Sequence, residues 1–197
     1  MRKIYWSFLT VLAFAATTLA GKVERATEKV TLEEAKSIEI EGELGAGKFT
    51  ISVAEMPEAA TFDIEYDKRT VKYHVDYYEK GEKGFLTFES DRRKNIGFDT
   101  GENRWDIVLS NKYESTLDLN IGACDANFDL GGLPLKELSI DIGAAAGVID
   151  FSKPNPVRLE EFRMDAGATS LEMHMLGNAN FSRFKFAGGV GSFNFDF

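Results

Sequence analysis

The feature that most constrains this chain is a segment that recurs four times between residues 117 and 197. Each copy carries a glycine at its sixth position, and successive glycines lie 21, 24 and 22 residues apart. The copies are LDLNIGACDANFDL, LSIDIGAAAGVIDF, FRMDAGATSLEMHM and FKFAGGVGSFNFDF, which place Gly122, Gly143, Gly167 and Gly189 at the shared position. Self-similarity at a period of about 20–25 residues is typical of stacked structural units. The sequence therefore predicts a repeat array.

Apolar residues alternate with polar ones on both sides of each glycine, which indicates strands with one buried face. They lie five, three and one positions before the glycine, and four, six and eight positions after it. A straight strand with this change of parity would turn its side chains over to the other face. We therefore interpret the glycine as a corner, where a residue free to take φ > 0 bends the chain. The predicted fold is an all-β, β-helix-like solenoid of stacked coils with glycine corners.

A fifth copy, IEGELGAGKFTISV, is centred on Gly45 and starts the array near residue 37. Between this copy and residue 117, the run 71–90 is predicted to form an inserted β-hairpin that turns at residues 81–84. We divide the chain into an N-terminal β region, 37–116, and stacked coils, 117–197, which can form one continuous domain 37–197. Residues 21–36 are charged and lack strand alternation, so a tether or a short capped helix is expected there.

Residues 1–20 have the pattern of a secretory signal peptide. A basic start is followed by an apolar stretch and by small residues up to Ala20. The apolar stretch is short for a bilayer span, which argues against an uncleaved anchor. We expect an exported protein that is periplasmic, bound to the cell surface or extracellular, with no transmembrane span after cleavage.

Charge and cysteine content exclude several functions. The net charge is −9, which argues against nucleic acid as a partner. Cys124 is the only cysteine, so no intramolecular disulfide can form. The alternation predicts that its side chain faces inward, as do Ala145 and Thr169 at the same position in the next copies. We therefore interpret it as a small buried thiol. The histidines, His74 and His174, show no pairing with a nucleophile, so we predict no catalytic residues, no enzyme activity and no cofactor.

The position two residues before the glycine is predicted to face outward, and the five copies hold Glu43, Asn120, Asp141, Asp165 and Ala187 there. Asn120, Asp141 and Asp165 are the candidate metal ligands. Stacked at the spacing of paired strands, these oxygens would form a ladder that a Ca²⁺ ion could neutralise. The other interpretation is that short acceptors cap backbone N–H groups at each corner. The aspartate–glycine repeats of calcium-binding β-rolls are absent, which favours capping. A Ca²⁺- or small-ligand-binding protein remains the alternative function.

A second alternative is a small outer-membrane β-barrel. The terminal phenylalanine, the alternating aromatic residues before it and the signal peptide all suit an eight-stranded barrel. The change of parity at each glycine argues against it, because a barrel strand keeps one phase across the membrane.

Five stretches resemble the toast-rack domains, which are secreted or membrane-tethered bacterial β-solenoids. They are AKSIEIEGELGAGKFTIS (35–52), FDIEYD (62–67), WDIVLSN (105–111), LDLNIGA (117–123) and LSIDIGAAAG (138–147). The family is related to LiaF-like cell-wall stress-response proteins and to adhesin-like domains. The resemblance implies a non-enzymatic rack of coils at the cell envelope, acting as a binding or scaffold module, with no catalytic residues to carry over. Its expected partner is a protein or a cell-wall polymer.

The C-terminal end departs from that family pattern. Such domains usually continue through further coils, whereas this sequence stops on a predicted strand at Phe197. Residues 193–197 would leave an apolar strand edge unpaired, which proteins normally avoid. We expect either that the chain is a fragment or that this edge meets a partner, and we favour the fragment.

Overall fold

The computed structural model describes residues 23–92 and 101–197, so the predicted signal peptide lies outside the described residues. The strands are β1 (Val23–Val30), β2 (Ser37–Ala54), β3 (Ala60–Asp67), β4 (Val71–Lys80), β5 (Lys83–Arg92), β6 (Asn103–Ser110), β7 (Glu114–Asp129), β8 (Leu135–Asp150), β9 (Glu161–His174), β10 (Phe184–Gly188) and β11 (Gly191–Phe195). A single 3-10 turn, η1 (Leu176–Ala179), is the helical element of the described residues. The prediction of an all-β fold is confirmed.

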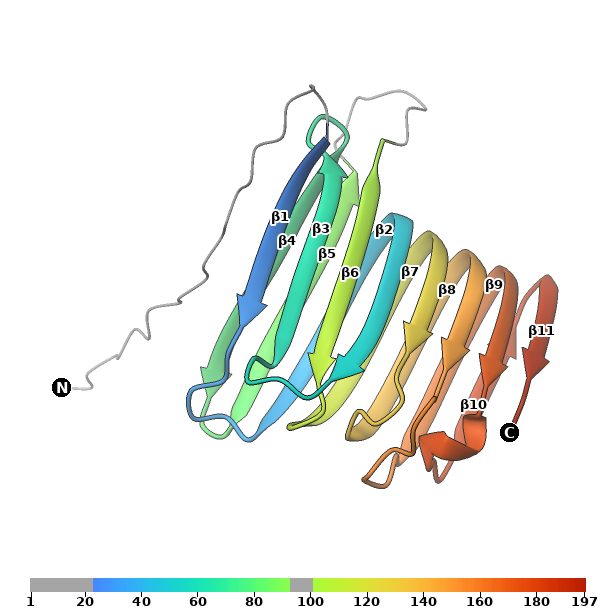
Figure 1. Ribbon diagram of the computed structural model, residues 1–197. Helices are drawn as coiled ribbons and strands as arrows, with labels where there is room; N and C mark the ends of the chain where they lie inside the picture. Colours follow the sequence, from blue (N-terminus) through green and yellow to red (C-terminus); the bar gives the residue numbers. More distant parts are fainter. Residues whose placement is uncertain (1–22, 93–100) are drawn as a thin grey trace.

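The strands form two layers, because the long strands bend over at one edge (Figure 1). The first half of β2 pairs with β5 and its second half pairs with β6, while both halves pair in parallel with β7. β7, β8 and β9 continue this parallel pairing, and β10 and β11 both pair with β9. We call the layer that contains β4, β5 and β10 the rear sheet, and the layer that contains β1, β3, β6 and β11 the front sheet.

The sheet is open. Its path runs β1-β3-β6-β2-β7-β8-β9-β10, and β4 pairs only with β5. The central strands are parallel, whereas a small outer-membrane β-barrel requires a closed antiparallel sheet. The prediction of a barrel, our second alternative, is therefore wrong for this fold.

Neighbouring copies of the repeat lie in register. Leu117 is opposite Leu138 and Ile121 is opposite Ile142, and the pairing resumes beyond the glycines with Ala123 opposite Ala144. In β7 the buried positions are odd-numbered before Gly122 and even-numbered after it, which is the change of parity seen in the sequence.

The reason for glycine at these positions differs from the one expected. None of the glycines at the shared position has a positive φ; among residues 23–92 and 101–197, the glycines that do are Gly81, Gly101 and Gly132. Instead, the backbones of successive strands approach closely where they bend. A Cβ on Gly167 would lie 2.3 Å from the carbonyl oxygen of Gly143, and one on Gly143 would lie 2.8 Å from that of Gly122. Close backbone stacking, not left-handed conformation, excludes a larger residue here.

The core lies between the two layers and is built from the inward rows of the repeat. Phe128, Phe162 and Met164 are each 0 % exposed. Towards β1 the core becomes aromatic, with the ring of Trp105 lying edge-on to that of Phe62 at 6.2 Å between centroids. Alternation of apolar and polar residues therefore decides which side of every strand faces inward.

One expectation about the N-terminal segment was wrong. Residues 23–30 are not a tether or a helix but the edge strand β1, which pairs antiparallel with β3. Its inward positions include Ala26 and the charged Glu28, so its alternation is hard to recognise in the sequence. The segment 31–36 contains no helix, and its backbone N–H groups at Glu33, Glu34 and Ala35 bind the carboxylate of Glu79. The predicted hairpin does form, as β4 and β5.

Candidate binding surface

The outer face of the rear sheet carries polar side chains in register on five neighbouring strands. Glu89 on β5 lies opposite Glu43 on β2, and Glu43 lies opposite Asn120 on β7. Asn120 is opposite Asp141 on β8, and Asp141 is opposite Asp165 on β9. The structure therefore brings the three candidate ligands into one row with Glu43, which holds the same position in the first copy, and it adds Glu89 from β5 to that row.

Basic side chains neutralise this face near its margins. Arg183 and Lys185 bind the two carboxylate oxygens of Glu161 at 2.9 Å and 2.8 Å. Hydrogen bonds from Lys185 and Arg183 hold the pKa of Glu161 below its ordinary value. Arg163 pairs with Asp165 at 2.6 Å. On the other side, Lys83 pairs with Glu39.

The centre of the face is less compensated, and there Arg163 contributes only a longer-range attraction to Asp141. Within the described residues, five carboxylates there have neither an ion pair nor a side-chain hydrogen bond: Glu41, Glu43, Glu89, Asp118 and Asp141. Glu41 lies opposite Asp118, and Glu43 lies opposite Glu89. Like charges directly opposite on neighbouring strands repel each other. We call these five residues the acidic centre.

The row does not form a metal site by itself. Among residues 23–92 and 101–197, no group of three or more His, Cys, Asp and Glu side chains is arranged to hold a metal ion. The capping interpretation does not describe this row either, since Asn120 and Asp141 make no side-chain hydrogen bond to a corner amide in that part of the chain. The Gly45 N–H is instead bonded by the Ser90 hydroxyl, at 3.3 Å.

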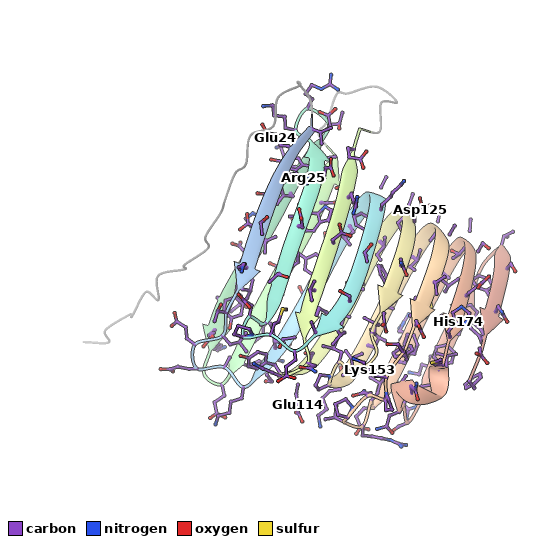
Figure 2. The ribbon with its side chains drawn as sticks, viewed as in Figure 1. Glu24, Arg25, Glu114, Asp125, Lys153 and His174 are labelled. Carbon is purple, nitrogen blue, oxygen red and sulfur yellow. The ribbon has the colours of Figure 1, made fainter. Side chains whose placement is uncertain are left out.

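Two hollows lie where the strands bend. One, of about 330 Å³, joins the acidic face and is lined by Glu43, Glu89, Asp91 and Asn120 among others. The other, of about 550 Å³, is a trough along the bending edge whose floor is formed by alanines of successive copies: Ala46, Ala123, Ala144 and Ala168. Lys48 and Asp125 lie beside it, and Figure 2 shows Asp125 at this edge. In the sequence, the trough is marked by the alanine that follows the shared glycine in the first four copies, at Gly45, Gly122, Gly143 and Gly167.

The sequence from residue 19 to residue 156, more than half of the chain, matches the family model described as the N-terminal domain of toast_rack, DUF2154. The chain belongs to this family. The toast-rack resemblance seen in the sequence is therefore confirmed. Comparison with curated protein sequences finds no match.

Solved structures with this arrangement include a putative cell adhesion protein from Clostridium sporogenes. It is 19 % identical, with a TM-score of 0.73, and the match covers 89 % of this chain and 99 % of that one. A putative adhesin from Bacteroides fragilis is 10 % identical with a TM-score of 0.24, over 90 % of this chain and 97 % of that one. The first similarity shows that the two proteins share a fold.

The reactive side chains of this toast-rack domain lie apart from one another. Burial raises the pKa of the Cys124 thiol to about 11, and its neighbours in register are Gly47 and Ala145. His74 is exposed on β4 and contacts Asp76, whereas His174 lies at the far end of β9 (Figure 2). Within the described residues, no helix has the length and hydropathy needed to cross a bilayer.

Proposed function

We propose that this protein is an exported, non-enzymatic β-solenoid that serves as a binding or scaffold module of the cell envelope. Membership of the toast-rack family and the fold shared with a putative cell adhesion protein support this assignment. The parallel, in-register pairing of β2, β7, β8 and β9 supports the view that they are stacked coils with glycine corners. Proteins built this way offer long rigid faces to their partners.

The observation that carries the proposal is the acidic centre on the outer face of the rear sheet. Its carboxylates are held on paired strands, so their spacing is rigid, and within the part of the chain that the structure describes none of them is in an ion pair. A partner with positive groups, either an envelope protein or a cell-wall polymer, would relieve their mutual repulsion. Attraction of this kind weakens as salt screens the charges.

A co-sedimentation assay with isolated cell walls, and a pull-down with envelope proteins, would test this proposal. We expect Glu41→Lys combined with Asp118→Lys to weaken binding by at least about tenfold, given the few kcal/mol of a like-charge contact. The matched control is Asp63→Lys with Glu172→Lys, which makes the same change of charge on the front sheet. Equal binding by both variants would show that the rear face is not the surface used. Absence of binding to walls and to envelope proteins would contradict the module itself.

The alternative function, Ca²⁺ or small-ligand binding, is favoured by one observation. Glu43, Asn120 and Asp141 are consecutive in one row, and among the described residues none of them has an ion-pair partner. If Ca²⁺ binds there, a concentration of about 100 times its Kd should stabilise the fold by about 2.7 kcal/mol. The midpoint of a thermal melt should rise with Ca²⁺, and Asp141→Asn should abolish that rise. No shift in the wild type would exclude this alternative.

A further inference from the structure

Two aromatic rings stack on each other on the outer face of the rear sheet. Tyr78 on β4 and Phe85 on β5 are directly opposite, with their ring centroids 4.9 Å apart and their planes 11° from parallel. The other tyrosines of β4, Tyr73 and Tyr77, are partly buried against the core, and their hydroxyls donate to glutamate carboxylates. Tyr78 is 59 % exposed, and its hydroxyl has no partner among the described residues.

This part of the face already holds one ammonium group between a ring and a carboxylate. The Nζ of Lys83 lies 5.3 Å from the centroid of the Phe85 ring and pairs with Glu39. Glu39 is directly opposite Phe85 on β2. The face of an aromatic ring attracts a cation, and a carboxylate beside the ring adds to that attraction. The contacts of Lys83 therefore show that an ammonium group is accommodated beside these rings.

The ring pair adjoins the acidic centre. Thr87 follows Phe85 on the same side of β5 and lies opposite Glu41, and Glu41 lies opposite Asp118. Diagonal neighbours on adjacent strands are about 7–8 Å apart, so Phe85 and the Glu41 carboxylate can contact the same molecule. A ligand that lies on the rings therefore also reaches carboxylates that have no cation of their own among the described residues.

Polar side chains in register lead from the ring pair across the sheet. The row crosses β4, β5, β2, β7 and β8 and consists of Asp76, Thr87, Glu41, Asp118 and Ser139. Paired strands lie about 4.8 Å apart, and the sugar units of an extended, β-linked polymer advance by a similar length, so one unit can lie over each strand. On β9 the row reaches Arg163, which would repel a positive group and so sets the end of the row.

We propose that the polymer bound by this face is a linear chain of amino sugars with free ammonium groups. The apolar C–H face of one sugar ring stacks on Tyr78 and Phe85. Ammonium groups of the following units pair with Glu41 and Asp118, and sugar hydroxyls bind the hydroxyl of Thr87. The inference rests on the proposed function, and it adds which kind of polymer binds and where one unit of it lies.

A polysaccharide fits this row better than a protein does. Protein partners anchor large side chains in well-packed pockets. The hollow of about 330 Å³ on this face lies where the strands bend, beside Glu43 and Glu89, and not at the ring pair. The row instead combines carboxylates with hydroxyls, and every unit of an amino-sugar polymer carries both an ammonium group and hydroxyl groups to meet them.

Isothermal titration calorimetry of the purified protein with a β-linked pentamer of glucosamine tests the inference. The N-acetylated pentamer has the same rings without the charges, and pentalysine has the charges without the sugar rings. We expect the glucosamine pentamer to bind, and each of the other two ligands to bind at least about tenfold more weakly, since each lacks one of the two contacts. Equal binding of the acetylated pentamer would overturn the role of the ammonium groups. Equal binding of pentalysine would overturn the sugar in favour of a basic protein.

Two sets of variants locate the contact. Tyr78→Ala should weaken binding of the glucosamine pentamer about three- to tenfold, because the stacking surface is lost, whereas Tyr78→Phe keeps the ring and should bind like the wild type. Glu41→Gln combined with Asp118→Asn should weaken binding at least about tenfold. The matched control, Asp63→Asn with Glu172→Gln, neutralises two carboxylates on the front sheet and should leave binding unchanged. Circular dichroism checks that each variant is folded.

The inference and the proposed function fail on different results. No binding of the glucosamine pentamer, or a folded Tyr78→Ala variant that binds it as tightly as the wild type, would overturn the inference. The proposed function is judged by sedimentation with cell walls and by the pull-down, using Glu41→Lys with Asp118→Lys. A protein that binds walls through the acidic centre but does not bind this pentamer would keep the function and lose the inference.

Discussion

The side-chain amide of Asn155 pairs with the backbone of Leu135 at both of its ends. Its Oδ1 accepts the Leu135 N–H at 3.2 Å, and its Nδ2 donates to the Leu135 carbonyl at 2.9 Å. Asn155 is 4 % exposed and lies in the insert between β8 and β9, whereas Leu135 begins β8. The asparagine side chain thus takes the place of a neighbouring strand residue. It holds the turn-rich insert between β8 and β9 against the stacked strands. Inserts of this kind are where the repeat copies differ in length.

We predict that Asn155→Ala lowers the free energy of unfolding by about 2–3 kcal/mol. The change removes the Nδ2 donor from the buried carbonyls of Leu135 and Ala179, whereas the Leu135 N–H keeps its bond to the Leu133 carbonyl. Each buried group that loses its partner costs about 1–3 kcal/mol. Urea unfolding followed by circular dichroism measures the loss. Asn127→Ala, at an exposed position on β7, is the control and should stay within about 0.5 kcal/mol of the wild type. Equal effects of the two substitutions would contradict this role.

Glu79 supplies a pH-dependent part of the stability. Its carboxylate accepts the N–H groups of Glu33, Glu34 and Ala35 at 2.7, 2.9 and 3.0 Å, and it also accepts the Tyr77 hydroxyl. Burial by itself raises the pKa of Glu79, but these hydrogen bonds outweigh it and the pKa lies below the ordinary 4.5. The folded state therefore favours the carboxylate. This contribution is complete above about pH 4.5 and is lost as the pH falls through the lower folded pKa.

We predict that Glu79→Gln destabilises the protein by about 1–2 kcal/mol at pH 7, since hydrogen bonds to a charged acceptor are the stronger ones. The difference from the wild type should shrink as the pH falls through the folded pKa of Glu79, which lies below 4.5, because the wild-type carboxylate is then protonated. Thermal melts at a series of pH values measure both effects. Glu41→Gln, which changes an exposed and unpaired carboxylate, should show no such pH-dependent loss. A constant difference for Glu79→Gln at every pH would count against this account.

The contacts of the stacked glycines predict that replacing glycine by alanine lowers the stability by different amounts at different copies. Gly167→Ala places its Cβ 2.3 Å from the Gly143 carbonyl oxygen, whereas Gly122→Ala places it 3.3 Å from that of Gly45. We expect the first substitution to cost about 2–3 kcal/mol and the second less than about 1 kcal/mol, because overpacking a tight contact typically costs 1–3 kcal/mol. Denaturant midpoints for the two variants measure this order. Equal losses would mean that backbone conformation, not close approach, selects glycine.

Cys124 should react slowly while the protein is folded. Its side chain is 7 % exposed and its pKa is raised to about 11, so only about 0.1 % is thiolate at pH 8. We predict that labelling with a thiol reagent at pH 8 is at least about 100-fold slower than for a free cysteine, and that urea abolishes the difference. Rapid labelling of the native protein would contradict the buried position.

Much of the fold was predictable because the relevant interactions are local and repeated. Alternation around Gly122 and Gly143 identified the strands, their inward faces and the point where parity changes, since a strand exposes successive side chains on opposite sides. β1 was missed because its inward face includes Glu28, whose hydrogen bond from Tyr73 comes from the opposite layer. A carboxylate at an inward position interrupts the alternation of apolar and polar residues by which a strand is recognised in a sequence.

The sequence by itself determined the all-β architecture, the family and the row of Asn120, Asp141 and Asp165. Periodicity carries that information, because identical offsets in each copy must meet when the copies stack in register. Only the tertiary structure showed that Glu89 of β5 joins this row beside Glu43 and that Glu41 lies opposite Asp118, while Arg163 already neutralises Asp165. It also decided that glycine is required by the neighbouring carbonyl and not by its own φ. The composition of the acidic face and the requirement for glycine both depend on contacts between strands far apart in the chain. The distances in these contacts are set only when the layers pack together.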